Sequence, residues 1–571
     1  MQKNKYDLGK ISTIVIAAFF MLQQANVFAQ PMPPNNQPPP PNDQQELREH
    51  NQQIARERQN KQEQTDVFLD KSEKNEAAAE LPEEEISFTI TEIKLIGEKS
   101  EKFHWVQELL QKYQGRKIGK EGINILVKQA SNAIIAKGYV TTRVTIPEQD
   151  ISKGVLTLQL IPGFVENITF ADPSRAARWD NALPIRPGDL LNIRDIEQGL
   201  EQFKRVPSQD ADIKILPGKT VGQSDIVISL KRDKPWRLTL STDDSGSETT
   251  GKIQMSTNLS IDNLFNNNDL FYASINHDLV SDSDKKGTDG GSIYYSIPYG
   301  YWTLSVSANQ SKYYQTITQY NQGFKYSGEN KNVNFKVQKI IERNQTSKTQ
   351  LSWAINKKIS RSFIEDTEFT NQRKEVTSNI LGLYHRQYYG KTVLDYEVDY
   401  QWAVPWFNSV LTENAAQDEP TSKYRIWTVD TTLTTPMKFG NRQGSYSLNI
   451  RGQYTNNTLF MTDQFSIGNR YTVRGFDGEE TLTAENGIYL RNEFSIPTEK
   501  GHEIYVGLDY GHVSGPSAKA LAGQTLIGSA VGFRGSLGRI SYDVFTGWPI
   551  KKPKDFKTAN QVFGFQINYQ Y

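Results

Sequence analysis

The chain has 571 residues, and its 65 lysine and arginine side chains balance 65 aspartates and glutamates. The length predicts several domains, while the neutral balance and the absence of cysteine exclude a general attraction to nucleic acid, disulfides, thiolate metal sites and cysteine nucleophiles. The mean hydropathy is −0.61, and no apolar run reaches the roughly 20 residues of a membrane helix, whereas alternating barrel strands are compatible with that value.

Residues 1–29 are predicted to be a secretory signal peptide. Three lysines precede an apolar segment at 11–22, and Ala29 stands before the cleavage site. An apolar segment of about a dozen residues is too short for a membrane anchor. The mature chain is therefore expected to leave the cytoplasm.

Residues 30–85 are predicted to be polar, with a proline-rich start, a helix at about 43–60 that Asp43 or the residue before it would cap, and an acidic linker. The helix has only two sizeable apolar residues, Leu47 and Ile54. It is therefore either unstable alone or placed in a polar environment. About 19 helical residues span nearly 30 Å, close to the thickness of a bilayer core. From the residues alone, a disordered tether remains the alternative.

Two α+β units of similar order are predicted over residues 86–162 and 163–234. Each has a strand, two helical stretches and two further strands, so the β-α-α-β-β order given twice indicates an internal repeat of architecture. In the second unit, a short helix is expected at 174–182, and Asn192 is expected to cap the longer helix that follows. Pro207 lies just beyond that helix.

The chain from residue 235 to 571 is predicted to form a transmembrane β-barrel. Apolar and polar residues alternate in segments such as 504–510 and 563–571, and aromatic residues stand at strand ends. About sixteen strands are expected, an even number as in bacterial barrels. A soluble β-sandwich would alternate as well, but the signal peptide and the aromatic terminal strand favour the barrel. Residues 456–486 form a loop too long for a hairpin turn, which usually indicates function.

Asp509 stands out because strand alternation directs it into the lumen. Leu508 and Tyr510 would face lipid, so Asp509 and its flanking glycines, Gly507 and Gly511, would face inward. The glycines leave room for another part of the chain to lie against the wall. The same alternation directs two charged residues of the preceding strand inward: Arg491 and Glu493.

An arginine in the long loop is the expected partner of this aspartate. Arg474 lies in the sequence Val473-Arg474-Gly475-Phe476. If the loop folds into a partly solvated lumen, the guanidinium can form two charge-assisted bonds to Asp509. An Arg-Gly-Phe sequence alone is a weak signal, and an exposed loop arginine is the alternative. The long loop, the glycine-framed aspartate and the barrel together favour the pair.

Motifs for catalysis or metal binding are not found. The six histidines are scattered without a His-Glu-x-x-His pair, and no serine has glycine two residues away on both sides. The sequence Gly218-Lys219-Thr220 resembles the end of a phosphate loop, but Ile213 occupies the position of the required first glycine. We therefore expect no enzyme, no cofactor and no metal.

The chain resembles the two-partner secretion transporters (the TpsB family), relatives of the haemolysin and filamentous-haemagglutinin exporters within the larger superfamily of barrel-insertion proteins. The resemblance covers nearly the whole mature chain. It rests on residues 137–142, 146–150, 154–156, 191–202, 205–208, 473–476 and 489–493. In the second unit the positions that carry it include Asn192, Arg194, Asp195, Glu197, Gln198, Arg205 and Pro207.

The resemblance implies two periplasmic POTRA domains, a sixteen-stranded antiparallel barrel, a helix that plugs the lumen and an inward-folded loop tipped by Arg474. It also implies a monomer in the lipid of a Gram-negative outer membrane, inserted by the barrel assembly machinery. Its partner would be a large secreted exoprotein of the haemolysin, adhesin or contact-dependent inhibition toxin type. The POTRA domains would capture that partner, which would cross the barrel unfolded and without ATP.

Two other functions remain as alternatives. A general barrel insertase would also explain the periplasmic units and the loop, but two units instead of a larger number favour export of one partner. A passive porin would explain the barrel but not the two units.

Overall fold

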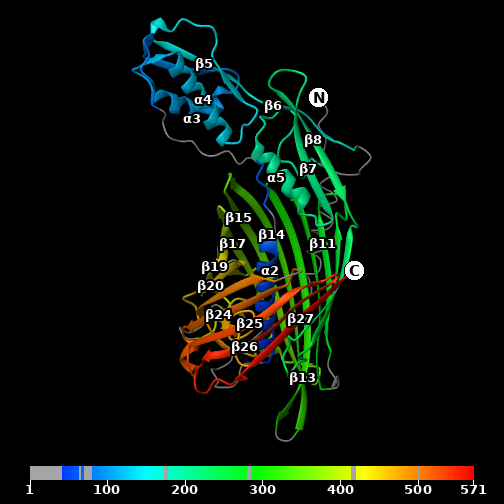
Figure 1. Cartoon of the computed structure of the whole chain (residues 1–571). Coiled ribbons are helices and arrows are strands. Elements are labelled where there is room, and N and C mark those ends of the chain that lie inside the picture. The colour runs from blue at the N-terminus through cyan, green and yellow to red at the C-terminus, as the bar shows by residue number, and fades with distance from the viewer. Residues whose placement is uncertain are drawn as a thin grey trace.

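The computed structural model describes residues 41–63, 66–69, 80–172, 178–279, 285–319, 322–412, 419–440, 442–498 and 501–571. The predicted signal peptide and proline-rich start lie outside these ranges. Across the described ranges, no helix combines the length and the apolarity that crossing a membrane requires. Figure 1 shows two small units of helices and strands above a barrel that encloses a helix.

The barrel is one closed antiparallel sheet of sixteen long strands, which confirms the predicted fold class. The strands are β9 (Trp236–Asp243), β10 (Gln254–Asp262), β11 (Leu270–Asp278), β12 (Lys286–Tyr299), β13 (Trp302–Gln319), β14 (Gln322–Arg343), β15 (Ser347–Ile364), β17 (Lys374–Tyr389), β18 (Thr392–Val404), β19 (Arg425–Phe439), β20 (Arg442–Tyr454), β23 (Asn486–Pro497), β24 (Glu503–Ser514), β25 (Thr525–Leu537), β26 (Ile540–Lys551) and β27 (Val562–Gln570). The two-residue β16 (Thr367–Glu368) is a small addition that pairs with β15. β27 closes the sheet against β9, and the N–H of Tyr571 extends this seam by donating to the carbonyl of Leu238 at 2.9 Å.

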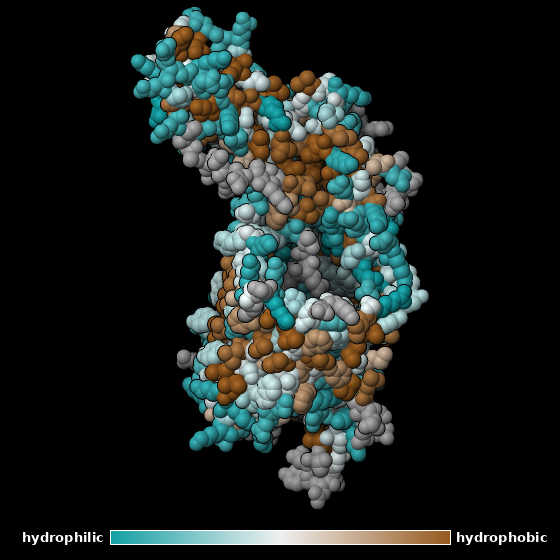
Figure 2. Space-filling view, viewed as in Figure 1, coloured by the Kyte–Doolittle hydropathy of each residue, from teal (hydrophilic) through white to brown (hydrophobic). Residues whose placement is uncertain are grey.

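Side chains on the barrel strands alternate between the lumen and the outer surface. On β24, Tyr505 and Asp509 are buried, whereas Leu508 is 56% exposed. Figure 2 shows outward-facing hydrophobic residues as a band on the visible face of the barrel. The alternation read from the sequence therefore assigns these side chains to the correct faces.

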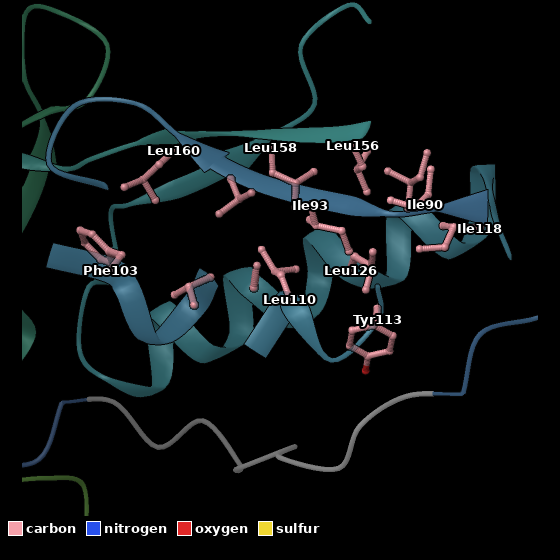
Figure 3. Packing of buried hydrophobic residues seen from close by; sticks show 14 of the residues in the cluster. Ile90, Ile93, Phe103, Leu110, Tyr113, Ile118, Leu126, Leu156, Leu158 and Leu160 are labelled. Atoms are coloured by element: carbon pink, nitrogen blue, oxygen red, sulfur yellow. The ribbon is translucent and has the colours of Figure 1, made fainter. Parts of the chain in front are cut away.

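The first small unit has a sheet in the order β2-β5-β4, with β2 parallel to β5. Its elements are β1 (Ser87–Ile90), β2 (Glu92–Ile96), α3 (His104–Gln111), β3 (Arg116–Gly119), α4 (Lys120–Ala136), β4 (Arg143–Thr145) and β5 (Val155–Ile161). Figure 3 shows Leu110 and Leu126 of the helices meeting Leu158 of the sheet in one buried core. The single strand predicted at the start of this unit is divided at Thr91, because the N–H of Thr91 donates to the carbonyl of Gly154 at 2.8 Å and β1 pairs with β3 instead.

The second unit repeats this arrangement in the order β6-β8-β7, again with the first strand parallel to the last. Its elements are β6 (Phe164–Phe170), α5 (Ile193–Lys204), β7 (Gln209–Pro217) and β8 (Gln223–Arg232). The short helix predicted at 174–182 is wrong in its described part, because residues 180–182 form a turn and residues 178 and 179 are not helical. Pro184 disfavours helical backbone at Leu183, so this turn does not continue as a helix. Residues 173–177 lie outside the described part of the chain.

The two units are joined at the start of α5. Asn192 caps α5 by accepting from the N–H of Arg194 at 2.9 Å, and it also donates to the carbonyl of Lys137 at 3.1 Å. The N–H of Ile193 donates to the carbonyl of Gly138 at 2.8 Å. Gly138 has a φ of 95°, and a Cβ there would overlap the Asn192 carboxamide. The end of the first unit's long helix therefore packs directly on the cap of α5.

Helix α2 (Pro41–Glu63) lies inside the barrel, as Figure 1 shows. It has 23 residues and extends slightly beyond both ends of the predicted helix at 43–60. Asp43 does not cap it: this residue lies in the first turn, and its carboxylate accepts from Lys374 Nζ at 2.8 Å. The polar surface of α2 is therefore placed among polar groups of the lumen.

Candidate functional site

The long connection between β20 and β23 folds back into the barrel and packs on its inner wall. It contains η4 (Met461–Asp463), β21 (Phe465–Ile467) and β22 (Leu482–Ala484), and the two short strands pair with each other. Its apolar side chains share a buried cluster with the wall: Phe465, Ile467, Val473, Phe476, Leu482, Ala484, Tyr489, Val513, Leu526 and Phe556. Burial of this apolar surface contributes to holding the loop inside.

The loop places Arg474 against Asp509 on β24. Arg474 Nε and Nη2 donate to the two carboxylate oxygens at 2.8 and 2.9 Å, and the backbone N–H of Arg474 adds a third bond at 2.9 Å. Arg474 is 3% exposed and Asp509 0%. The expectation of a partly solvated site is therefore wrong here, because the loop itself covers the pair. Buried charges are tolerated only when paired in this way.

Arg474 has further acceptors that sequence reasoning did not assign to it. Nη1 donates to Glu493 at 2.6 Å, and Nη2 donates to the carbonyl of Asn492 at 3.0 Å. Glu493 also pairs with Arg534 at 2.8 Å, and Arg534 pairs with Glu503 at 2.7 Å. Arg474 therefore lies in a chain of charges that connects the loop to β23, β24 and β25.

Glycines in the wall allow the loop backbone to approach closely. A Cβ on Gly507 would overlap the guanidinium of Arg474, and a Cβ on Gly528 would overlap the carbonyl oxygen of the same residue. A Cβ on Gly511 would lie 2.7 Å from a methyl group of Val473. The wall therefore carries no side chains at these positions where the loop lies on it, as the glycines around Asp509 led us to expect.

The residues that flank Arg474 hold the tip of the loop. Val473 and Phe476 are buried, and the ring of Phe476 meets Phe556 edge to face with centroids 5.8 Å apart. Gly475 has a φ of 93°, and a Cβ there would overlap the carbonyl of Trp548. The backbone turn at Gly475 thus needs a residue without a side chain.

Two charged residues, one half-buried and one fully buried, anchor the loop apart from Arg474. Arg491 points inward, as alternation predicts, and Nη1 donates to the carbonyl of Tyr471 at 2.9 Å. Glu485, which sequence reasoning missed, accepts from the N–H of Ser517 at 3.0 Å and is fully buried. No motif or spacing in the sequence distinguishes Glu485 from other glutamates.

Helix α2 is bound by polar contacts to both the loop and the wall. Arg48 donates to the carbonyl of Gly478 in the loop at 2.8 Å. On the wall, Ser311 donates to Glu49 at 2.6 Å. Contacts nearer the C-terminal end of α2 join Arg58 to Tyr489 at 2.9 Å and to Asp430 at 3.2 Å. The helix and the loop therefore occupy the lumen together and contact each other.

The residues singled out on α5 face the mouth of the barrel. Asp195 accepts from the hydroxyl of Tyr301 at 2.7 Å, and Gln198 donates to the carbonyl of Gly300 at 3.1 Å. Both partners lie in the turn between β12 and β13. Burial raises the pKa of Asp195, although the hydrogen bond from Tyr301 acts in the opposite direction. These side chains thus hold the second unit on the barrel.

A buried ion pair on α5 extends this contact. Arg194 Nη1 donates to both carboxylate oxygens of Glu197 at 2.7 Å. Arg343, the last residue of β14, also approaches Glu197, with 3.5 Å between Nε and Oε2. Sequence reasoning missed Arg343, because nothing local connects the end of a barrel strand to a helix about 145 residues earlier.

Arg205 and Pro207 follow α5 at the same interface. Arg205 donates to the carbonyl of Asn268 at 3.1 Å and to the hydroxyl of Ser296 at 2.6 Å. Pro207 lies beyond the helix, as expected. Within the described ranges, no group of three or more histidine, aspartate or glutamate side chains is placed to hold a metal ion. The polar and charged groups at this interface and in the lumen bind and position segments of polypeptide chain.

Comparison with known proteins gives consistent matches along the chain. Residues 222–535 match the family model described as haemolysin secretion/activation protein ShlB/FhaC/HecB, residues 88–163 match a ShlB-type POTRA domain, and residues 164–217 match a POTRA domain. The outer membrane transporter CdiB-2 of Burkholderia pseudomallei (strain 1026b) is 41% identical over 476 residues, 82% of each chain. CdiB of Dickeya dadantii (strain 3937) is 29% identical over 497 residues, 85% of this chain and 87% of the relative. The solved structure of CdiB from Acinetobacter baumannii has a TM-score of 0.84 at 27% identity and covers 94% of this chain and 100% of its own.

Proposed function

This chain belongs to the haemolysin secretion/activation protein family ShlB/FhaC/HecB, whose members are two-partner secretion transporters, and we propose that it exports one large partner protein through its barrel. It is an outer-membrane protein with its POTRA domains in the periplasm. The relatives named CdiB make a contact-dependent inhibition toxin the first candidate for the partner, with a haemolysin or an adhesin as the others.

One observation carries this proposal: α2 and the inward-folded loop lie together in the lumen and contact each other. Arg48 of α2 binds the loop at Gly478, and the loop is anchored to the wall by Arg474 and Asp509. A passive pore has no need for a helix held in its lumen. A transporter that opens only for its partner needs such a helix, because a permanently open barrel would leak solutes.

The proposed export has three steps. The POTRA domains first capture an unfolded segment of the partner in the periplasm, by adding an extended strand to a sheet edge. Helix α2 then leaves the lumen, and the partner passes through unfolded along the anchored loop. No ATP is used, and the partner's folding outside the cell keeps it from returning.

Comparing the secreted and outer-membrane proteomes with and without this chain tests the proposal. Loss of one large secreted protein, with the other outer-membrane proteins unchanged, is the expected result. Depletion of many outer-membrane proteins would indicate a general insertase, and no change in either fraction would indicate a passive porin. Complementation with Arg474→Ala should fail, and complementation with Arg442→Ala, which changes an exposed arginine at the start of β20, should succeed.

A further inference from the structure

A short segment that follows α2 is bound at the mouth of the barrel. Asp66, three residues after the end of α2, lies among Lys348, Arg386 and Tyr388 on β15 and β17. The hydroxyl of Tyr388 donates to Asp66 at 2.8 Å, Arg386 Nη1 lies 3.4 Å away, and Lys348 Nζ also donates to the carboxylate. The Asp66 side chain is 2% exposed. Burial alone would raise the pKa of Asp66, but Lys348 and Arg386 lower it below its usual value.

Helix α5 holds the backbone that follows Asp66. The N–H of Val67 donates to Glu201 at 2.8 Å, and the N–H of Leu69 donates to Glu197 at 2.7 Å. In an extended chain, alternate N–H groups point the same way about 6.6 Å apart, and carboxylates four residues apart on a helix lie about 6 Å apart along its axis. The two spacings agree. Glu197 and Glu201 therefore form a pair of acceptors that suits the backbone of an extended segment, whatever its side chains.

Two further groups complete the site. Arg343 donates to the carbonyl of Val67 at 2.5 Å, and its guanidinium lies 5.7 Å from the ring centroid of Phe68. The ring of Phe68 meets Tyr388 edge to face, with centroids 5.2 Å apart. The site therefore takes a carboxylate at one position and an aromatic ring two residues later, and it binds the backbone between and after them.

We propose that these residues form a binding site for an extended peptide that carries a carboxylate two residues before an aromatic ring, and that residues 66–69 of the chain itself occupy this site at rest. An extended segment of the secreted partner with the same chemistry competes for it. Because Asp66 lies three residues after the end of α2, displacement of residues 66–69 frees α2 to leave the lumen. This inference rests on the proposed export function.

Fluorescence anisotropy with the full chain in detergent tests the site. The probe is a labelled synthetic peptide of residues 64–70, Gln-Thr-Asp-Val-Phe-Leu-Asp. The variant Asp66→Asn should bind this peptide at least about tenfold more tightly than the wild type, because the competing segment of the chain is weakened. Adding Lys348→Met should abolish binding, and so should replacing the first aspartate of the peptide by asparagine.

Asp212→Asn, at an exposed position on β7, is the matched control and should bind the peptide as the wild type does. Equal affinity of the wild type and Asp66→Asn, or no binding to Asp66→Asn, would overturn the proposal.

Conductance in planar bilayers gives a second measurement: free peptide should raise the open fraction of the wild type. If the open fraction is higher in Asp66→Asn than in the wild type but the peptide has no effect on either, residues 66–69 act only as a tether. That outcome would also contradict the proposed binding site. Secretion that depends on the chain without peptide binding would refute this inference and leave the export function standing.

Discussion

The carbonyl oxygen of Arg474 occupies the space that a side chain on Gly528 would need, so the loop backbone and the wall of β25 are in direct contact. Gly528→Ala should therefore push the tip of the loop away from the wall, at a cost of about 1–3 kcal/mol as for other overpacked sites. Secretion should fall, and protease added outside the cell should cut the loop faster, while the barrel remains heat-modifiable. Gly452→Ala is the matched control, because its Cβ would lie 3.7 Å from the nearest atom. Equal secretion by the two variants would contradict the close contact.

Arg474→Ala should impair secretion more than Asp509→Ala. Without the arginine, Asp509 is a buried carboxylate that lacks its guanidinium, which costs about 3–5 kcal/mol. Without the aspartate, Arg474 keeps Glu493 and the carbonyl of Asn492. Arg474→Lys should also be impaired, because an ammonium group cannot form the planar two-bond contact. Secreted partner per amount of heat-modifiable barrel is the measurement.

The double variant should be little worse than Arg474→Ala alone, because both residues serve one contact. Arg442→Ala, at an exposed position, should secrete normally and controls for loss of a positive charge. Additive losses in the double variant would show that Arg474 and Asp509 act separately.

Deletion of residues 30–65 should raise single-channel conductance without preventing assembly of the barrel, because α2 then no longer fills the lumen. A reversible test of the same point holds α2 in the lumen with a cross-link between two introduced cysteines. The chain has no cysteine of its own, so only the introduced pair can react. Glu49→Cys with Ser311→Cys places two thiols where the native side chains are 2.6 Å apart. A short cleavable thiol cross-linker should then block secretion and conductance until it is cleaved.

The control for this cross-link is Glu57→Cys with Ser311→Cys. Glu57 lies eight residues, or about 12 Å, further along the helix, beyond the reach of a short linker. A cross-linked Glu49 and Ser311 pair that still secretes would mean that α2 stays in the lumen during export.

A soluble fragment of residues 80–233 should bind the N-terminal region of the partner, weakly because capture orders a flexible chain. Each unit has its own buried core, so the fragment should fold. It begins at residue 80 to retain Glu84, which accepts from the N–H groups of Glu121 and Gly122 at 2.9 and 2.8 Å at the start of α4. Those bonds lower the pKa of Glu84. Binding by the full chain but not by the fragment would place recognition in the barrel.

Docking of the second unit on the barrel should weaken as pH rises, because of Asp195. Burial raises the pKa of this carboxyl above its usual 3.8, so the folded chain binds the proton more tightly than the unfolded one. The stability that the protonated form contributes is therefore lost as pH rises through the raised pKa. Asp195→Asn keeps an acceptor for Tyr301 and removes this titration. Its urea midpoint for release of the unit should exceed that of the wild type at pH 7 and converge with it towards pH 4.

The exposed Asp212→Asn is the control for the Asp195 series and should follow the wild type at both pH values. If the urea midpoints of Asp195→Asn and the wild type differ by the same amount from pH 7 to pH 4, Asp195 does not titrate at the interface.

The sequence by itself determined the features that depend on residues close together in the chain, such as the alternation of side chains along a strand and the cap of a helix. A period of two residues along β24 was enough to place Asp509 in the lumen and Leu508 outside, since neighbouring side chains on a strand must face opposite sides. The cap of α5 by Asn192 was equally local, because a side-chain amide needs only the N–H two residues later. The helix expected at 174–182 was wrong in its described part, where residues 180–182 form a turn, because Pro184 disfavours continuing that turn as a helix through Leu183.

Only the tertiary structure decided which charges meet. Arg343 and Glu201 are 142 residues apart and pair at 2.7 Å because the barrel closes and the second unit docks on its mouth. The positions on α5 that the family resemblance singled out proved to face that mouth, and Arg474 proved to hold Glu493 as well as Asp509. No local pattern specifies such partners, because an ion pair depends on the distance between side chains in space, and that distance is set by how distant segments pack.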